Sequence, residues 1–123
     1  MLTEHQKKYL ITIYHLGQNG ESVRTTDISS YLHVTKPSTV SMLNKLSEEG
    51  LIMKEPNRQI KLTKKGITEA NEIFTSSVIL QNFFVSKVRI SSDKAAEASM
   101  LLSSGLDADT LDKIVCFALS ENQ

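Results

Sequence analysis

The 123-residue sequence predicts a mainly α-helical protein with one small β-hairpin. Apolar residues recur at helical spacing through most of the chain, but residues 51–54 and 59–62 are short runs of strand type. Between these runs lies Glu55-Pro56-Asn57-Arg58, where proline at the second position favours a chain reversal. Two short helices joined by a tight turn are expected just before the hairpin. This order predicts an N-terminal winged helix-turn-helix, followed by an α-helical domain.

The first two helices are marked by their expected caps. Thr3 and Gln6 have the spacing of a capping box, and apolar residues follow at helical intervals until Gly17. Either Thr25 or Thr26 is expected to cap the second helix.

The third helix is expected to begin near Lys36 and to have one polar side. Pro37 suits a first helical turn, because its missing N–H would be unpaired there in any case. Val40, Leu43 and Leu46 are expected to form the buried side. The outward side is then expected to carry Lys36, Ser38, Thr39, Ser41 and Lys45.

The second half of the chain is expected to be helical and to form a dimer. Thr63 is expected to cap a long helix, and two more helices are expected over residues 92–104 and 107–120. Their apolar residues exceed what a thin helical pair can bury, and symmetric pairing is the commonest way to cover such a surface. We therefore expect a winged helix-turn-helix domain at 1–66 and a dimerization domain at 67–123.

Charge is unevenly distributed although the formal net charge is zero. Residues 1–65 carry ten Lys and Arg against six acidic residues, whereas residues 66–123 carry four against eight. The first part is therefore about +4 and the second about −4, counted from the same sequence. Such asymmetry predicts a basic surface on the winged domain.

Other features argue against several classes of protein. The lone cysteine, Cys116, excludes an internal disulfide framework and a clustered thiolate metal site, and its apolar neighbours suit packing better than catalysis. The sequence contains no targeting segment and no apolar run of eighteen residues. We expect a soluble cytoplasmic protein that is not an enzyme and does not enter a membrane.

The polar side of the third helix is expected to face duplex DNA. The second helix of a helix-turn-helix lies in the major groove, where hydroxyl groups can bond to bases or phosphates. Arg24 and the first amides of the second helix are expected to hold a phosphate, while Lys54 adds positive charge to the hairpin. The predicted DNA-binding residues are Arg24, Thr25, Thr26, Lys36, Pro37, Ser38, Thr39, Ser41, Lys45, Arg58 and Lys61.

Several stretches carry a family pattern. They are Val23-Arg24-Thr25-Thr26-Asp27-Ile28, Pro37-Ser38-Thr39-Val40-Ser41-Met42-Leu43, Gly50-Leu51-Ile52 and Ile60-Lys61-Leu62-Thr63-Lys64-Lys65-Gly66. The sequence thereby resembles the iron- and manganese-dependent repressors of the diphtheria toxin repressor and manganese transport regulator type. The resemblance implies a homodimeric transcriptional repressor that pairs through its first helix and its C-terminal helices and binds a palindromic operator.

The resemblance also implies a site for Mn²⁺ or Fe²⁺, but this sequence lacks the ligands. The family's ligand positions correspond to Lys8, Ile11, Ser77, Met100, Ser103 and Ser104. A lone thioether does not hold a hard divalent cation, and an ammonium group would repel one. No metal cofactor is therefore predicted, and the chain is expected to act without metal activation.

Two alternatives remain open at this point. One is a winged-helix regulator of the multiple-antibiotic-resistance type, which senses a small ligand. The other is a winged-helix protein-interaction module, which would show no salt-dependent binding to DNA.

Overall fold

The computed structural model describes residues 2–18 and 20–121. It divides the chain into two compact units, Met1–Asn71 and Glu72–Gln123, each of which is described by itself. The boundary falls inside a long helix, α4 (Lys64–Phe83). The mainly helical fold with one two-stranded sheet agrees with the sequence prediction.

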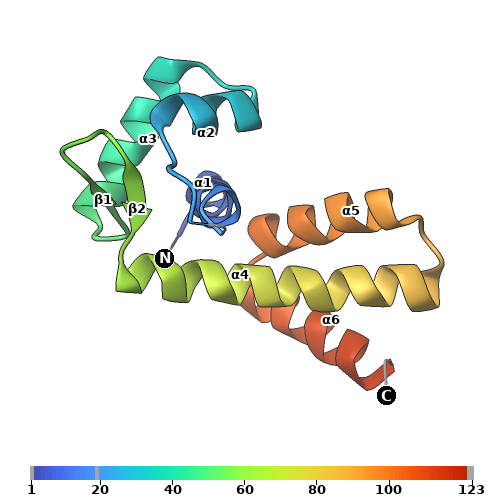
Figure 1. Cartoon of the computed structure of the whole chain (residues 1–123). Coiled ribbons are helices and arrows are strands. Elements are labelled where there is room, and N and C mark those ends of the chain that lie inside the picture. The colour runs from blue at the N-terminus through green and yellow to red at the C-terminus, as the bar shows by residue number, and fades with distance from the viewer. Residues whose placement is uncertain (1, 19, 122–123) are drawn as a thin grey trace. The chain divides into compact units, whose positions relative to one another are not determined.

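Three helices open the first unit: α1 (Glu4–Leu16), α2 (Thr25–Leu32) and α3 (Lys36–Glu48), all labelled in Figure 1. The capping box of α1 is confirmed, because the Gln6 amide donates to Thr3 Oγ1 (3.1 Å) and the Thr3 amide donates to Gln6 Oε1 (2.9 Å). The cap of α2 differs from the prediction. Thr25 is already helical, and the orphan amide of Arg24 is satisfied by Asp27 Oδ2 at 2.9 Å.

The wing is an antiparallel pair of strands, β1 (Ile52–Lys54) and β2 (Ile60–Leu62), with Met53 opposite Lys61. The predicted reversal is confirmed, since the Arg58 amide donates to the Glu55 carbonyl at 2.9 Å. Arg58 has a positive φ of 66°, so it adopts the left-handed conformation within the five-residue loop 55–59 between β1 and β2.

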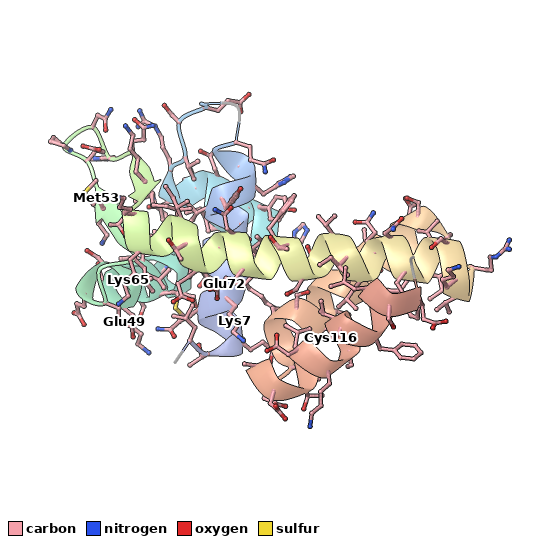
Figure 2. All side chains as sticks on the ribbon, turned by 90° about the horizontal axis from the view of Figure 1, so that it is seen from below. Lys7, Glu49, Met53, Lys65, Glu72 and Cys116 are labelled. Atoms are coloured by element: carbon pink, nitrogen blue, oxygen red, sulfur yellow. The ribbon has the colours of Figure 1, made fainter. Side chains whose placement is uncertain are left out.

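The core of the first unit joins the three helices to the hairpin. Its fully buried leucine and isoleucine side chains are Leu10, Ile28, Leu43, Leu46 and Leu51. Figure 2 labels Glu49, just after α3, and Lys65, in the first turn of α4; the Lys65 ammonium donates to the Glu49 carbonyl at 3.1 Å. The Lys65 contact thus joins the first turn of α4 to the end of α3.

The second unit contains the rest of α4, a π-helical turn η1 (Phe84–Val88), α5 (Ser92–Gly105) and α6 (Ala108–Glu121). Its core centres on Leu80, Leu111 and Ala118. The predicted cap of the last helix is confirmed, because Asp107 Oδ2 accepts from the Thr110 amide at 3.0 Å. In the described residues, no helix is both long and apolar enough to cross a bilayer.

The packing prediction for Cys116 is wrong. Its thiol is exposed on α6, where Figure 2 labels it, because the helix buries Leu111 and Ala118 and position 116 points away from that face. Residues 114–119 are all apolar, but a helix buries only those that lie on one face, so some of them are exposed.

Candidate nucleic-acid interface

Helix α3 presents a polar face to solvent. Thr35 caps the helix by accepting from the Ser38 amide at 3.2 Å, and its hydroxyl donates to Ser38 Oγ at 2.8 Å. Beyond this cap, the predicted DNA-binding residues of α3 that the structure exposes are Lys36, Pro37, Ser38, Ser41 and Lys45. Each is therefore free to contact a ligand that lies along the helix.

The outward placement of Thr39 is wrong. Thr39 is fully buried, whereas Val40, which was expected in the core, is 39% exposed. The buried line of α3 runs through Thr39, Leu43 and Leu46, spaced by four and then three residues. Burial of the Thr39 hydroxyl costs little, because Oγ1 donates to the Thr35 carbonyl at 3.1 Å.

A groove of about 520 Å³ lies between the start of α2, the first half of α3 and the wing. We call it the cationic groove, because four of its residues are Arg24, Lys36, Lys54 and Arg58. Its other lining residues are Thr25, Thr26, Val40, Leu43, Glu55 and Ile60. The one acidic residue, Glu55, is already paired with Lys61 at 3.9 Å. The groove therefore offers a concentration of positive charge to an anionic ligand.

Five of the eleven predicted DNA-binding residues meet in this groove: Arg24, Thr25, Thr26, Lys36 and Arg58. Pro37, Ser38, Ser41 and Lys45 lie outside it on the exposed surface of α3. Lys61 lies on the wing but lines a different hollow, beside the end of α1. The exposed predicted residues are thus distributed over the groove, the surface of α3 and the wing.

Sequence reasoning missed Asn44. Its side-chain oxygen accepts a hydrogen bond from the ammonium of Lys54, which ties α3 to strand β1. Helical spacing could have identified Asn44 as an outward residue, because position 44 lies on the same side of the helix as positions 37 and 41. This bond orients a groove cation that would otherwise have a free side chain.

Four of the positions that the resemblance assigns to metal ligands hold side chains that are paired or buried. In α1, Lys8 pairs with Glu4 at 3.7 Å, and Ile11 is buried. In the second unit, Ser77 Oγ donates to the Phe74 carbonyl at 2.8 Å and Ser104 Oγ to the Met100 carbonyl at 2.8 Å.

Ser103 differs from these serines. Its hydroxyl is buried and has no hydrogen-bond partner among the described residues. A neutral hydroxyl and a thioether do not suit a hard divalent cation, which prefers carboxylate and imidazole ligands. Over residues 2–18 and 20–121, no three His, Cys, Asp or Glu side chains are grouped to hold a metal ion. The residues present therefore do not fit Mn²⁺ or Fe²⁺.

Residues 1–60, which hold the cationic groove, match the family described as iron dependent repressor, N-terminal DNA binding domain. Residues 1–60 are therefore an N-terminal DNA-binding domain of the iron-dependent repressor family. The match agrees with the resemblance seen in the sequence and identifies a DNA-binding regulator of transcription.

The chain is similar to named relatives over most of its length. An uncharacterized HTH-type transcriptional regulator of Methanocaldococcus jannaschii is 26% identical over 117 residues, which are 94% of each chain. A hypothetical protein from Sulfolobus solfataricus has a TM-score of 0.66 at 21% identity and is covered over 88% of its length. That match covers 94% of the present chain.

Two longer regulators share the fold. The manganese regulator SloR has a TM-score of 0.73 at 24% identity, and IdeR from T. acidophilum has 0.76 at 22%. The alignments cover 91% and 92% of this chain but only 54% and 52% of SloR and IdeR. The chain thus spans about half the length of these two proteins.

Proposed function

We propose that this chain is a transcriptional repressor that binds a palindromic operator as a homodimer and needs no divalent metal to do so. The observation that carries the proposal is the cationic groove between α2, α3 and the wing. Four cations around one groove can neutralise phosphates of a DNA backbone, and the exposed polar face of the neighbouring helix can contact base edges in the major groove.

The first step of the proposed mechanism is electrostatic. Arg24, Lys36, Lys54 and Arg58 neutralise phosphates on either side of the groove, with the amides at the start of α2 as further donors. These contacts fix the register of α3 on the duplex. Ser38, Ser41 and Lys45 then face the bases or the neighbouring phosphates.

The second step is pairing of two copies. Large apolar side chains are exposed on the second unit, and the most exposed are Leu101 at 54% and Phe117 at 59%. Val78, Val85, Val88 and Leu119 are exposed as well. A symmetric dimer would bury such side chains and present two winged units to successive half-sites of a palindrome.

The test of DNA binding is a fluorescence-anisotropy titration. Duplexes are first selected from a random library with the purified chain, and affinity is then measured from low to moderate salt. We expect a steep loss of affinity with salt, and Lys36→Ala should reduce the slope of log K against log salt by about two, one for each subunit of the dimer. Lys113→Ala, at an exposed helical lysine of the second unit, is the matched control and should leave the slope unchanged.

Two outcomes would overturn this part of the proposal. The first is no duplex binding at low ionic strength, and the second is an equal effect of both lysine substitutions. Salt-insensitive behaviour would instead favour a protein-interaction module.

The proposal of metal independence rests on the side chains at the positions that the resemblance assigns to metal ligands. Two of the serine hydroxyls at the family's ligand positions donate to backbone carbonyls, and the third is a neutral group in a buried setting. Without clustered carboxylates, there is no repulsion for a cation to relieve, so the DNA-binding form does not depend on an ion. Isothermal titration of chelator-treated protein with Mn²⁺ should show no stoichiometric binding, and a one-to-one site of micromolar affinity would contradict the proposal.

The proposed activity is binding, without catalysis. The relative from M. jannaschii is named as a transcriptional regulator, and the groove that carries the proposal is lined by four cations suited to phosphates.

A further inference from the structure

The cationic groove has an apolar floor. Val40, Leu43 and Ile60 line it, and the last two are almost completely buried, at 1% and 4% exposure. Val40 is different, since it is 39% exposed in the second turn of α3. An apolar side chain thus lies open to solvent in a groove lined by four cations.

Four cations beside one exposed valine favour an anionic ligand that also carries an apolar group. The cations favour phosphates, whereas the exposed valine gains free energy only when another apolar group covers it. Among the four DNA bases, thymine alone presents a methyl group in the major groove. The N-terminal half of a recognition helix is the part that approaches base edges, and Val40 lies in that half.

We propose that Val40 is a specificity-determining residue that contacts the 5-methyl group of one thymine in each operator half-site. The inference rests on the proposed DNA-binding function and adds to it a base preference. Lys36 and Arg58 hold the backbone beside the groove, and Val40 then covers the methyl group. The contact discriminates thymine from cytosine, because cytosine presents a polar amino group in the major groove instead.

A sugar contact is the nearest rival, and it makes a different prediction. A deoxyribose packed on Val40 would weaken binding to every sequence alike when the valine is truncated. A methyl contact makes the effect depend on one base. Replacing thymine by deoxyuridine removes only the methyl group, so it separates the two.

The chain supplies a matched control in Val34. It is 40% exposed, close to the 39% of Val40, but it lies between α2 and α3 and does not line the groove. Val34→Ala removes the same atoms at a similarly exposed site. Circular dichroism melts of Val40→Ala and Val34→Ala confirm that both variants are folded before DNA is added.

The experiment is a uracil scan of the selected operator. Each thymine is replaced singly by deoxyuridine, and anisotropy gives the affinity for the wild-type chain, Val40→Ala and Val34→Ala. We expect one thymine per half-site at which deoxyuridine weakens wild-type binding about fourfold, the effect of one buried methyl-sized group. At that position, Val40→Ala should show no further loss, while Val34→Ala should show the full fourfold loss.

The outcomes separate this inference from the function on which it rests. Salt-dependent binding with a flat uracil scan, or with a uracil effect that persists undiminished in Val40→Ala, overturns the thymine contact and leaves the DNA-binding proposal intact. Absence of any duplex binding overturns both.

Discussion

A Cβ atom added at Gly66 would stand 2.0 Å from the carbonyl oxygen of Leu51. The same oxygen accepts a hydrogen bond from the Thr63 amide at 3.1 Å. The first turn of α4 therefore lies directly against the residue that precedes strand β1. The absence of a side chain at position 66 is what permits this close approach.

Gly66→Ala is expected to destabilise the first unit. Since the backbone of Leu51 must move away, we expect a loss of about 1–3 kcal/mol, as for overpacking in a core. Thermal unfolding followed by circular dichroism measures it. Gly105→Ala, at an exposed glycine in the last turn of α5, is the control and should leave stability unchanged or slightly raised. An unchanged melting temperature for Gly66→Ala would show that the close contact is not made.

Substitutions of Arg58 should change DNA affinity without lowering stability. Its left-handed backbone costs a non-glycine residue about 1–2 kcal/mol, so Arg58→Gly should hold or raise the melting temperature. The same change removes a groove cation from each subunit and should weaken DNA binding and reduce the salt slope by about two. Arg58→Lys keeps the charge and should restore most of the slope. A parallel fall in stability and affinity for Arg58→Gly would refute this separation.

Thr39 should behave as a core residue. Thr39→Val keeps the shape and removes the hydroxyl with its bond to the Thr35 carbonyl, so we expect a change within about 1 kcal/mol in stability. DNA affinity should stay unchanged. Lys45→Ala, at an exposed residue of the same helix, should lower affinity without affecting the melting temperature. If the Thr39 variant lost affinity while it kept its stability, the hydroxyl would have to reach DNA.

Ser103→Ala should stabilise the second unit. The buried hydroxyl has no partner in the described part of the chain, and such a group costs about 1–3 kcal/mol, so its removal should raise the melting temperature. Ser104→Ala is the comparison, because its hydroxyl donates to the Met100 carbonyl. That variant should be neutral or slightly destabilised. A destabilised Ser103→Ala would mean that its hydroxyl has a bonding partner after all.

Local signals in the sequence predicted the elements well. The capping residues Thr3 and Asp107 and the proline of the wing turn act on their immediate neighbours, so their effects are readable from a few residues. Asp27 was missed as the partner of the α2 cap, because Thr25 and Thr26 offered equally good local candidates.

The side of a helix that is buried was harder to predict. Thr39 and Val40 are adjacent and similar in size, and helical spacing to Leu43 admits either. Apolarity favoured Val40, but tertiary packing selected Thr39, whose hydroxyl could be satisfied by its own helix. The cationic groove could not be predicted as a unit, because it joins α2, α3 and the wing, which only the tertiary fold brings together.

The most direct measurement of the central claim is the affinity for the selected operator with and without metal. Two anisotropy titrations are needed, one in excess chelator and one in Mn²⁺ above the concentration of protein. The proposal of a metal-independent repressor predicts dissociation constants that agree within about twofold, since a ligand without differential binding cannot shift an equilibrium. An affinity that rises tenfold or more on adding Mn²⁺ would contradict it.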